Sequence, residues 1–136
     1  MLGTNHEKGA TVLVVEDEML IADMVSDALT EAGFNVCAVG SAAEALERFV
    51  GGLKPDILFT DINLPGDMDG SALAICARTL QPELSVVYAS GRKTAAQIDT
   101  VPGSQFVAKP YSTHAMCALL RDIAERHSTT VVALDC

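Results

Sequence analysis

Short apolar runs alternate with amphipathic segments along the whole chain. The runs at residues 12–15, 36–39, 57–60, 86–89 and 106–108 contain many β-branched side chains, which is typical of strands buried on both faces. The segments between them place apolar residues at helical spacing and predict helices at residues 19–32, 42–50 and 71–80, with a last helix after Ser112. Strands and helices in alternation predict a parallel sheet with helices on both faces, which is a doubly wound α/β fold.

Helix-end signals support these boundaries. Gly33 stands where a helix commonly ends on a glycine, and Ser41 with Glu44 three residues later forms a capping-box pattern. Between Ser90 and Lys109 there are only 18 residues for the crossover that a fourth helix usually makes. The candidate helix at residues 94–100 is marginal in length without packing, so we predict a short or disordered fourth helix.

Composition favours one domain and narrows the range of partners. We divide the chain into a mobile lead at residues 1–9, a domain at residues 10–127 and a tail at residues 128–136. The start has no basic segment followed by an apolar one, and no apolar run is long enough to span a bilayer, which predicts a cytoplasmic protein. The formal net charge of −9 argues against binding to nucleic acid or anionic membranes.

Polar side chains follow four of the five predicted strands. Glu16 and Asp17 follow the first strand, Asp61 the third, Ser90 the fourth and Lys109 the fifth. Because ligands of doubly wound sheets bind at the carboxyl ends of the strands, we expect these side chains to converge at one edge.

This set of groups predicts phosphoryl chemistry with a metal ion. Clustered carboxylates repel one another unless a cation neutralises them, and hard oxygen ligands without Cys or His suit Mg2+. A carboxylate can act as a nucleophile and form an aspartyl phosphate. Mg2+ and an ammonium group would then stabilise the charge on the transferring phosphoryl group.

Four segments carry a family resemblance. The sequences LVVEDE, FTDINLPGDMDG, VVYASG and FVAKPY resemble the signature segments of response-regulator receiver domains, in the order of that family and over roughly residues 10–127. The resemblance implies a flavodoxin-like, five-stranded sheet of order 2-1-3-4-5. The segment around Ser90 is also similar to an aromatic-Ala-Thr-Gly subgroup of receivers.

The resemblance also implies a role for each matching residue. Asp61 matches the phosphoacceptor, Ser90 the hydroxyl that responds to the phosphoryl group, and Lys109 the lysine of the family pattern. The remaining matches are the metal-binding acid pair Glu16 and Asp17, the metal-binding backbone carbonyl of Asn63, the aromatic switch Phe106, the small residue Gly91, Arg92 at a position that tunes dephosphorylation, and Pro110 after a cis peptide bond.

The implied function is signalling rather than enzymatic turnover. A histidine kinase or a histidine phosphotransfer protein would donate the phosphoryl group to Asp61 with Mg2+ as cofactor. No effector domain is expected after residue 127, so the chain would act as a stand-alone receiver, a monomer or weak homodimer that signals through protein contacts or a phosphorelay. The downstream target is unknown.

Three other readings use the same residues. A phosphatase with an aspartyl nucleophile would need an acid two residues after Asp61, where this chain has Asn63. A nucleotide-binding module would need a glycine-rich loop where Glu16 and Asp17 stand. A receiver-like scaffold that takes no phosphate remains the main alternative. Asp67 and Asp69 resemble further metal ligands, but polar residues are also expected in any exposed loop.

Overall fold

Five strands form one parallel sheet in this computed structural model, which describes residues 9–91 and 99–135, with side chains as far as residue 126. The sheet has the order β2-β1-β3-β4-β5. The strands are β1 (Thr11–Val15), β2 (Asn35–Val39), β3 (Ile57–Asp61), β4 (Ser85–Ser90) and β5 (Gln105–Ala108). The predicted doubly wound fold and its strand order are confirmed.

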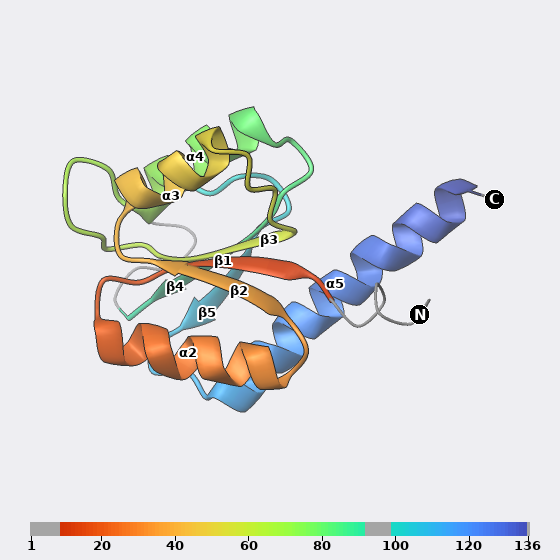
Figure 1. Cartoon of the computed structure of the whole chain (residues 1–136), viewed down its shortest axis with the longest axis horizontal. Helices are drawn as coiled ribbons and strands as arrows, with labels where there is room; N and C mark the ends of the chain where they lie inside the picture. The colour runs from red at the N-terminus through yellow and green to blue at the C-terminus, as the bar shows by residue number, and fades with distance from the viewer. Residues whose placement is uncertain (1–8, 92–98, 136) are drawn as a thin grey trace.

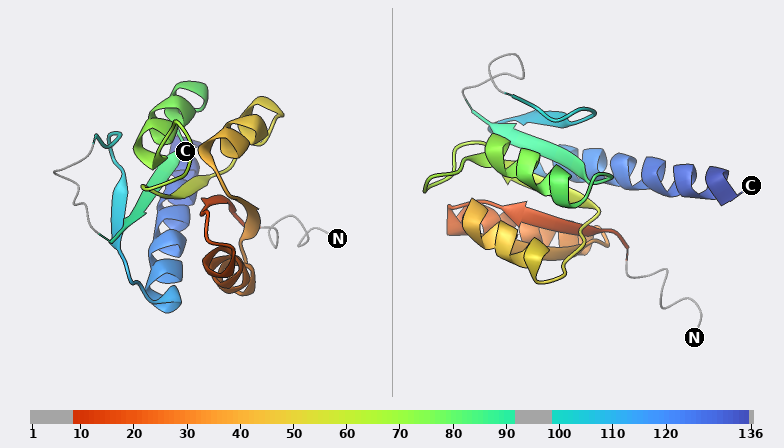
Figure 2. Two further views of the ribbon diagram at one scale, coloured as in Figure 1. Left: turned by 90° about the vertical axis from the view of Figure 1, so that its left-hand side faces the viewer. Right: turned by 90° about the horizontal axis from the view of Figure 1, so that it is seen from above.

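Four described helices cover the two faces of the sheet. They are α2 (Met19–Glu31), α3 (Ala42–Val50), α4 (Gly70–Leu80) and α5 (Thr113–Asp135). Figure 1 shows α3 and α4 on one face and α2 and α5 on the other, and the turned views in Figure 2 show the same three layers. Each helix leads from the carboxyl end of one strand back across the sheet, so the loops after the strands gather at one edge.

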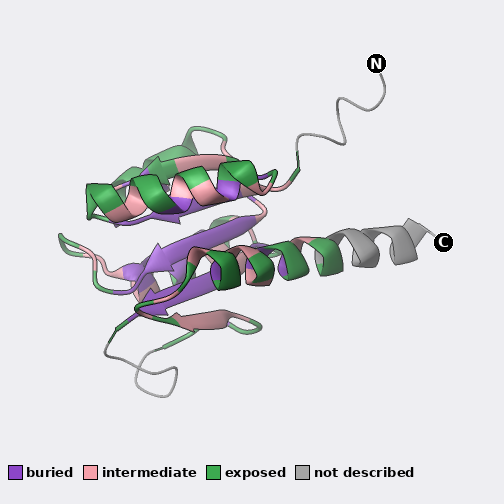
Figure 3. Cartoon of the chain, turned by 90° about the horizontal axis from the view of Figure 1, so that it is seen from below, coloured by how far each residue is buried: buried purple, intermediate pink, exposed green. Residues whose placement is uncertain are grey.

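Two apolar cores lie between these layers. Leu13 and Leu58 face α3 and α4, whereas their neighbours Val12, Val14 and Phe59 face α2 and α5. Successive side chains of a strand point to opposite faces, which is why each central strand contributes to both cores. The central strands β1, β3 and β4 are accordingly buried in Figure 3, while the outer faces of the helices are exposed. Continuous apolar runs were therefore a reliable signal for the central strands.

The predicted helix ends are confirmed in detail. Gly33 has a φ of 102° directly after the last turn of α2, a conformation that glycine adopts without strain. At the start of α3 the Ser41 hydroxyl accepts the Glu44 backbone N–H at 3.2 Å. The Glu44 carboxylate accepts the Gly40 backbone N–H at 2.8 Å. The two residues thus satisfy one donor each, as in a capping box shifted by one position.

The end of the chain forms a longer helix than the sequence pattern suggested. α5 runs through residue 127 to Asp135 and extends beyond the sheet (Figure 1). No break in the backbone separates domain from tail, and the division at residue 127 stays a prediction. Residues 94–98 of the candidate fourth helix at residues 94–100 lie outside the described residues. Among the helices that the structure describes, none combines the length and the hydropathy needed to cross a bilayer.

Candidate functional site

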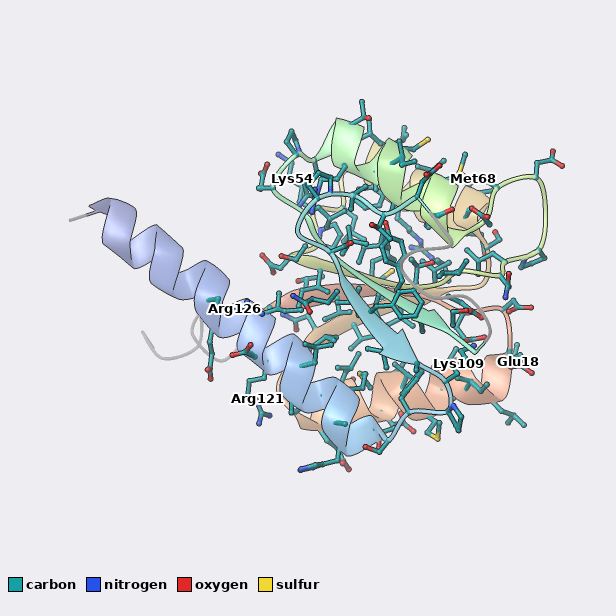
Figure 4. All side chains as sticks on the ribbon, turned by 180° about the vertical axis from the view of Figure 1, so that it is seen from behind. Glu18, Lys54, Met68, Lys109, Arg121 and Arg126 are labelled. Carbon is teal, nitrogen blue, oxygen red and sulfur yellow. The ribbon has the colours of Figure 1, made fainter. Side chains whose placement is uncertain are left out.

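The carboxyl ends of β1, β3, β4 and β5 bring five predicted site residues to one edge of the sheet. Glu16 and Asp17 directly follow β1, and Lys109 directly follows β5. Asp61 and Ser90 are the last residues of β3 and β4. Figure 4 shows Lys109 at the same end of the molecule as Glu18, opposite the end that carries Lys54.

Three carboxylates form the centre of the site. Glu16, Asp17 and Asp61 each offer one oxygen, and these oxygens lie within 4.8 Å of one another. Glu16 and Asp61 are 6% and 8% exposed, whereas Asp17 is open to solvent. A metal ion could enter from the side of Asp17 and reach the two buried carboxylates. All three ligands are hard oxygens, so the donor set fits Mg2+ better than a thiophilic metal.

Lys109 compensates only part of this negative charge. Its Nζ donates to Asp61 Oδ2 at 2.9 Å and lies 3.5 Å from Glu16 Oε1. Burial alone would lower the pKa of Lys109, but the hydrogen bond and the charge of Asp61, together with the charge of Glu16, leave that pKa raised. Among the described residues, Lys109 thus pairs with two of the three clustered carboxylates, and these groups together carry a surplus negative charge.

The surplus negative charge affects the pKa of Glu16. Burial raises the pKa of its carboxyl group, and the charges of Asp61 and Asp17 raise it further. The backbone N–H of Glu18, which donates to Glu16 Oε2 at 3.1 Å, and the charge of Lys109 both act in the opposite direction. Ionisation of Glu16 is therefore less favourable here than for a glutamate in free solution.

The backbone of Asp61 is held by a glycine that sequence reasoning overlooked. A Cβ atom added to Gly70 would overlap the carbonyl oxygen of Asp61, so no larger residue fits at this point. The Gly70 N–H also donates to the Ile62 carbonyl at 2.8 Å, and the Thr60 hydroxyl donates to the Asp61 carbonyl at 2.8 Å. Gly70 begins α4 after the acidic loop, but its close approach to Asp61 is visible only in the folded chain.

Tyr111 was also overlooked as part of the site. Its ring packs edge-on against Phe59, with ring centroids 5.8 Å apart. Together with Val25, Glu16 and Asp61 it lines a void of about 10 Å³ beneath the carboxylates. Burial and the charge of Glu16 raise the pKa of Tyr111 to about 12. Its position directly after the Lys-Pro pair was the available signal.

Ser90 and Lys109 are linked through the backbone. Ser90 is only 2% exposed, and its carbonyl accepts the Lys109 N–H at 2.9 Å. The peptide bond between Lys109 and Pro110 is cis. Among the described residues, the nearest atom to a Cβ at Gly91 would be the Lys109 Cβ at 3.6 Å, which is an ordinary contact.

The other candidates differ in how far they are buried and in what they contact. Phe106 is half-buried in β5 with its ring centroid 6.5 Å from that of Tyr88. Asn63 has an exposed side chain in the loop after β3, and Arg92 lies outside the described residues. Asp69 caps α4 by accepting the Ala72 N–H at 2.9 Å, so it has a structural role. Asp67 is exposed, as expected for a polar loop.

Comparisons with known proteins agree with this geometry. The family model described as "Response regulator receiver domain" matches residues 12–121. A crystal structure of a response regulator receiver protein from Sinorhizobium medicae is 31% identical with a TM-score of 0.79, covering 86% of this chain and 95% of that one.

Two curated proteins illustrate the range of relatives. The probable transcriptional regulatory protein TcrX of Mycobacterium tuberculosis is 32% identical over 90% of this chain and 53% of its own length. The sensor kinase CckA of Brucella abortus is 30% identical over 90% of this chain and 13% of its own length. The chain thus spans about half the length of the curated transcriptional regulators that it matches, or less in the case of the kinase.

Proposed function

Because the chain belongs to the response regulator receiver domain family, we propose that Asp61 accepts a phosphoryl group from a phosphohistidine. The donor would be a histidine kinase or a histidine phosphotransfer protein. The observation that carries the proposal is the ion pair of 2.9 Å between Lys109 Nζ and Asp61 Oδ2 inside a cluster of three carboxylates. This arrangement joins a buried nucleophile, a fixed cation and a candidate metal site.

The transfer moves one phosphoryl group between two amino acid side chains. Lys109 engages Asp61 Oδ2 and thereby orients the carboxylate, so we assign the attack on phosphorus to Oδ1. The new O–P bond forms as the bond between phosphorus and the imidazole nitrogen of the donor breaks. The electron pair of that bond stays on the nitrogen, and Asp61 becomes an acyl phosphate.

The surrounding residues have distinct parts in this proposal. Glu16, Asp17 and Asp61 would hold Mg2+ together with the backbone carbonyl of Asn63. When bound, Mg2+ supplies positive charge both to the carboxylates and to the phosphoryl oxygens. Lys109 provides the second cation. The hydroxyl of Ser90, at the end of the strand beside β3, would donate to a phosphoryl oxygen.

An exposed apolar surface near the three carboxylates supports binding of a partner protein there. Met19, Leu20 and Met24, which we call the α2 patch, are 76%, 85% and 50% exposed in the first turns of α2. Apolar side chains gathered on a surface commonly mark protein contacts. We propose that the phosphodonor docks on the α2 patch, and that the signal leaves through protein contacts on the side of Phe106 and α5, in a phosphorelay or with a downstream target.

Intact-mass analysis after incubation with phosphoramidate and Mg2+ tests the proposal. We expect one phosphate adduct on the native protein and none on Asp61→Asn or in a sample with EDTA. Asp67→Asn is the matched control, since it removes an exposed acid from the following loop and should leave the adduct unchanged.

The other outcomes separate the alternatives. A folded native protein without an adduct would contradict the proposal and favour the phosphate-independent scaffold. Release of many equivalents of phosphate from each protein molecule would favour the aspartyl phosphatase.

A further inference from the structure

The side chain of Tyr88 joins two segments of the chain inside the core. It is fully buried in β4, and its hydroxyl accepts the backbone N–H of Val101 at 3.1 Å. The Ser104 side chain also hydrogen bonds to this hydroxyl. Residues 99–104 lead directly into β5, so the tyrosine ties the approach to β5 to the neighbouring strand.

The same side chain lies in line with the site. Residues two apart in a strand share one face of the sheet, so Tyr88 and Ser90 point to the same side. In the pairing of β4 with β5, Tyr88 stands opposite Phe106 and Ser90 opposite Ala108. The rings of Tyr88 and Phe106 are in contact, with centroids 6.5 Å apart. Tyr88 and Ser90 therefore share one face of β4, and Phe106 lies beside Tyr88 on β5.

The core needs the ring of Tyr88 but not its hydroxyl. A phenylalanine would fill the same apolar volume among Leu58, Val86 and Phe106. A buried hydroxyl is unfavourable unless it is hydrogen-bonded, so its benefit depends on the bond from Val101. The hydrogen bond of this hydroxyl thus couples the position of residues 101–104 to the position of β4.

We infer that the Tyr88 hydroxyl is a latch that holds Ser90 in its resting position and that phosphorylation of Asp61 releases it. The inference rests on the proposed function. The bond between the Val101 N–H and the Tyr88 hydroxyl measures 3.1 Å, so a displacement of β4 away from Val101 would weaken it. A shift of Ser90 toward a phosphoryl group would move the end of β4 and stretch this bond.

The proposed latch predicts the direction in which a mutation of Tyr88 shifts the equilibrium between the resting and the shifted state. A bond made only in the resting state stabilises that state, so its removal raises the population of the shifted state. A typical buried hydrogen bond corresponds to a change of about two- to tenfold in such an equilibrium. A purely structural tyrosine would instead leave phosphorylation unchanged or slow it when mutated.

Tyr88→Phe provides the test, with Thr79→Val as the matched control that deletes a hydroxyl bonded to a backbone carbonyl on the exposed side of α4. Amide hydrogen exchange at Val101 is measured before and after phosphorylation with phosphoramidate. We expect exchange at Val101 to accelerate on phosphorylation in the native protein and in the control. In Tyr88→Phe it should already be fast, and phosphorylation should proceed about two- to tenfold faster.

Three outcomes would overturn the latch. Unchanged exchange at Val101 in a native protein that carries the phosphate adduct would remove it while leaving the proposed function intact. A Tyr88→Phe protein phosphorylated no faster than the native one would do the same. Absence of the adduct on the native protein would overturn both. The native exchange measurement decides the question even if the variant fails to fold.

Discussion

The polar groups at the two ends of the sheet differ in how they are paired. At the amino ends of the strands, Asp56 Oδ2 accepts the Thr11 N–H at 2.8 Å and Arg78 Nε donates to the Leu84 carbonyl at 2.7 Å. These side chains satisfy backbone groups next to β1 and β4. At the carboxyl ends, oxygens of three carboxylates lie within 4.8 Å of one another, and Lys109 pairs with two of these carboxylates.

This difference between the two ends indicates which polar groups stabilise the fold and which destabilise it. The paired polar groups at the amino ends of the strands contribute favourably to the stability of the fold, because each buried donor or acceptor has a partner. Carboxylates with too little positive charge reduce stability, and such arrangements are typical of sites that bind a ligand. The comparison predicts that equivalent substitutions at the two ends will have opposite effects.

The largest expected effect on phosphorylation comes from changing one aspartate at each end of the sheet. Asp61→Asn should abolish the phosphate adduct, and it should raise the free energy of unfolding in EDTA by about 1 kcal/mol because it relieves repulsion. Asp56→Ala should keep the adduct and lower the free energy of unfolding by about 1–2 kcal/mol, since the Thr11 N–H loses its partner. Urea unfolding and intact mass measure both quantities, and equal stability changes of the same sign would refute the comparison.

Gly70→Ala should disturb the carboxylate site at the carboxyl ends of the strands through packing alone. Its methyl group would overlap the Asp61 carbonyl oxygen, so we expect a loss of about 1–3 kcal/mol in the free energy of unfolding and slower phosphorylation. Gly40→Ala is the matched control, because its Cβ would only make an ordinary contact of 3.4 Å with a Glu44 carboxylate oxygen. The site assignment would be weakened if both variants phosphorylated at the native rate.

The pH dependence of stability should report Glu16. Burial raises the pKa of Glu16 above its ordinary value of 4.5, so the folded protein holds this proton more tightly than the unfolded chain does. In EDTA, the contribution of Glu16 to stability should be complete below about pH 4.5 and decline as pH rises through the raised pKa. Glu16→Gln should remove this decline, and saturating Mg2+ should reverse it in the native protein. A native profile in EDTA identical to that of Glu16→Gln would contradict this account.

The smallest effect is expected for an ion pair that belongs to neither end. Arg126 and Asp122 lie 3.1 Å apart on α5 with side chains 59% and 62% exposed. Solvent and salt screen such pairs, so Arg126→Ala should change the free energy of unfolding by about 0.5 kcal/mol or less. A loss above about 1 kcal/mol in urea unfolding would show that exposure is a poor guide to the value of charges here.

Some expectations from the sequence stay untested. Stand-alone action is one of them, because the chain spans about half the length of the transcriptional regulators that it resembles. The role of Arg92 and the form of the fourth helix fall on residues outside the described part of the chain. The three described cysteines are free and half-buried, and two of them, Cys37 and Cys117, pack against the two apolar cores.

The sequence by itself determined the order of strands and helices and the polar residues that reach one edge of the sheet. Apolar periodicity is a local property, and parallel strands necessarily bring their carboxyl ends together. Only the tertiary structure decided that Gly70 must touch Asp61, that Tyr111 lines the void below the carboxylates and that Tyr88 binds Val101. These contacts join separate elements, and no spacing along the chain encodes the distance between side chains that meet only after the helices pack on the sheet.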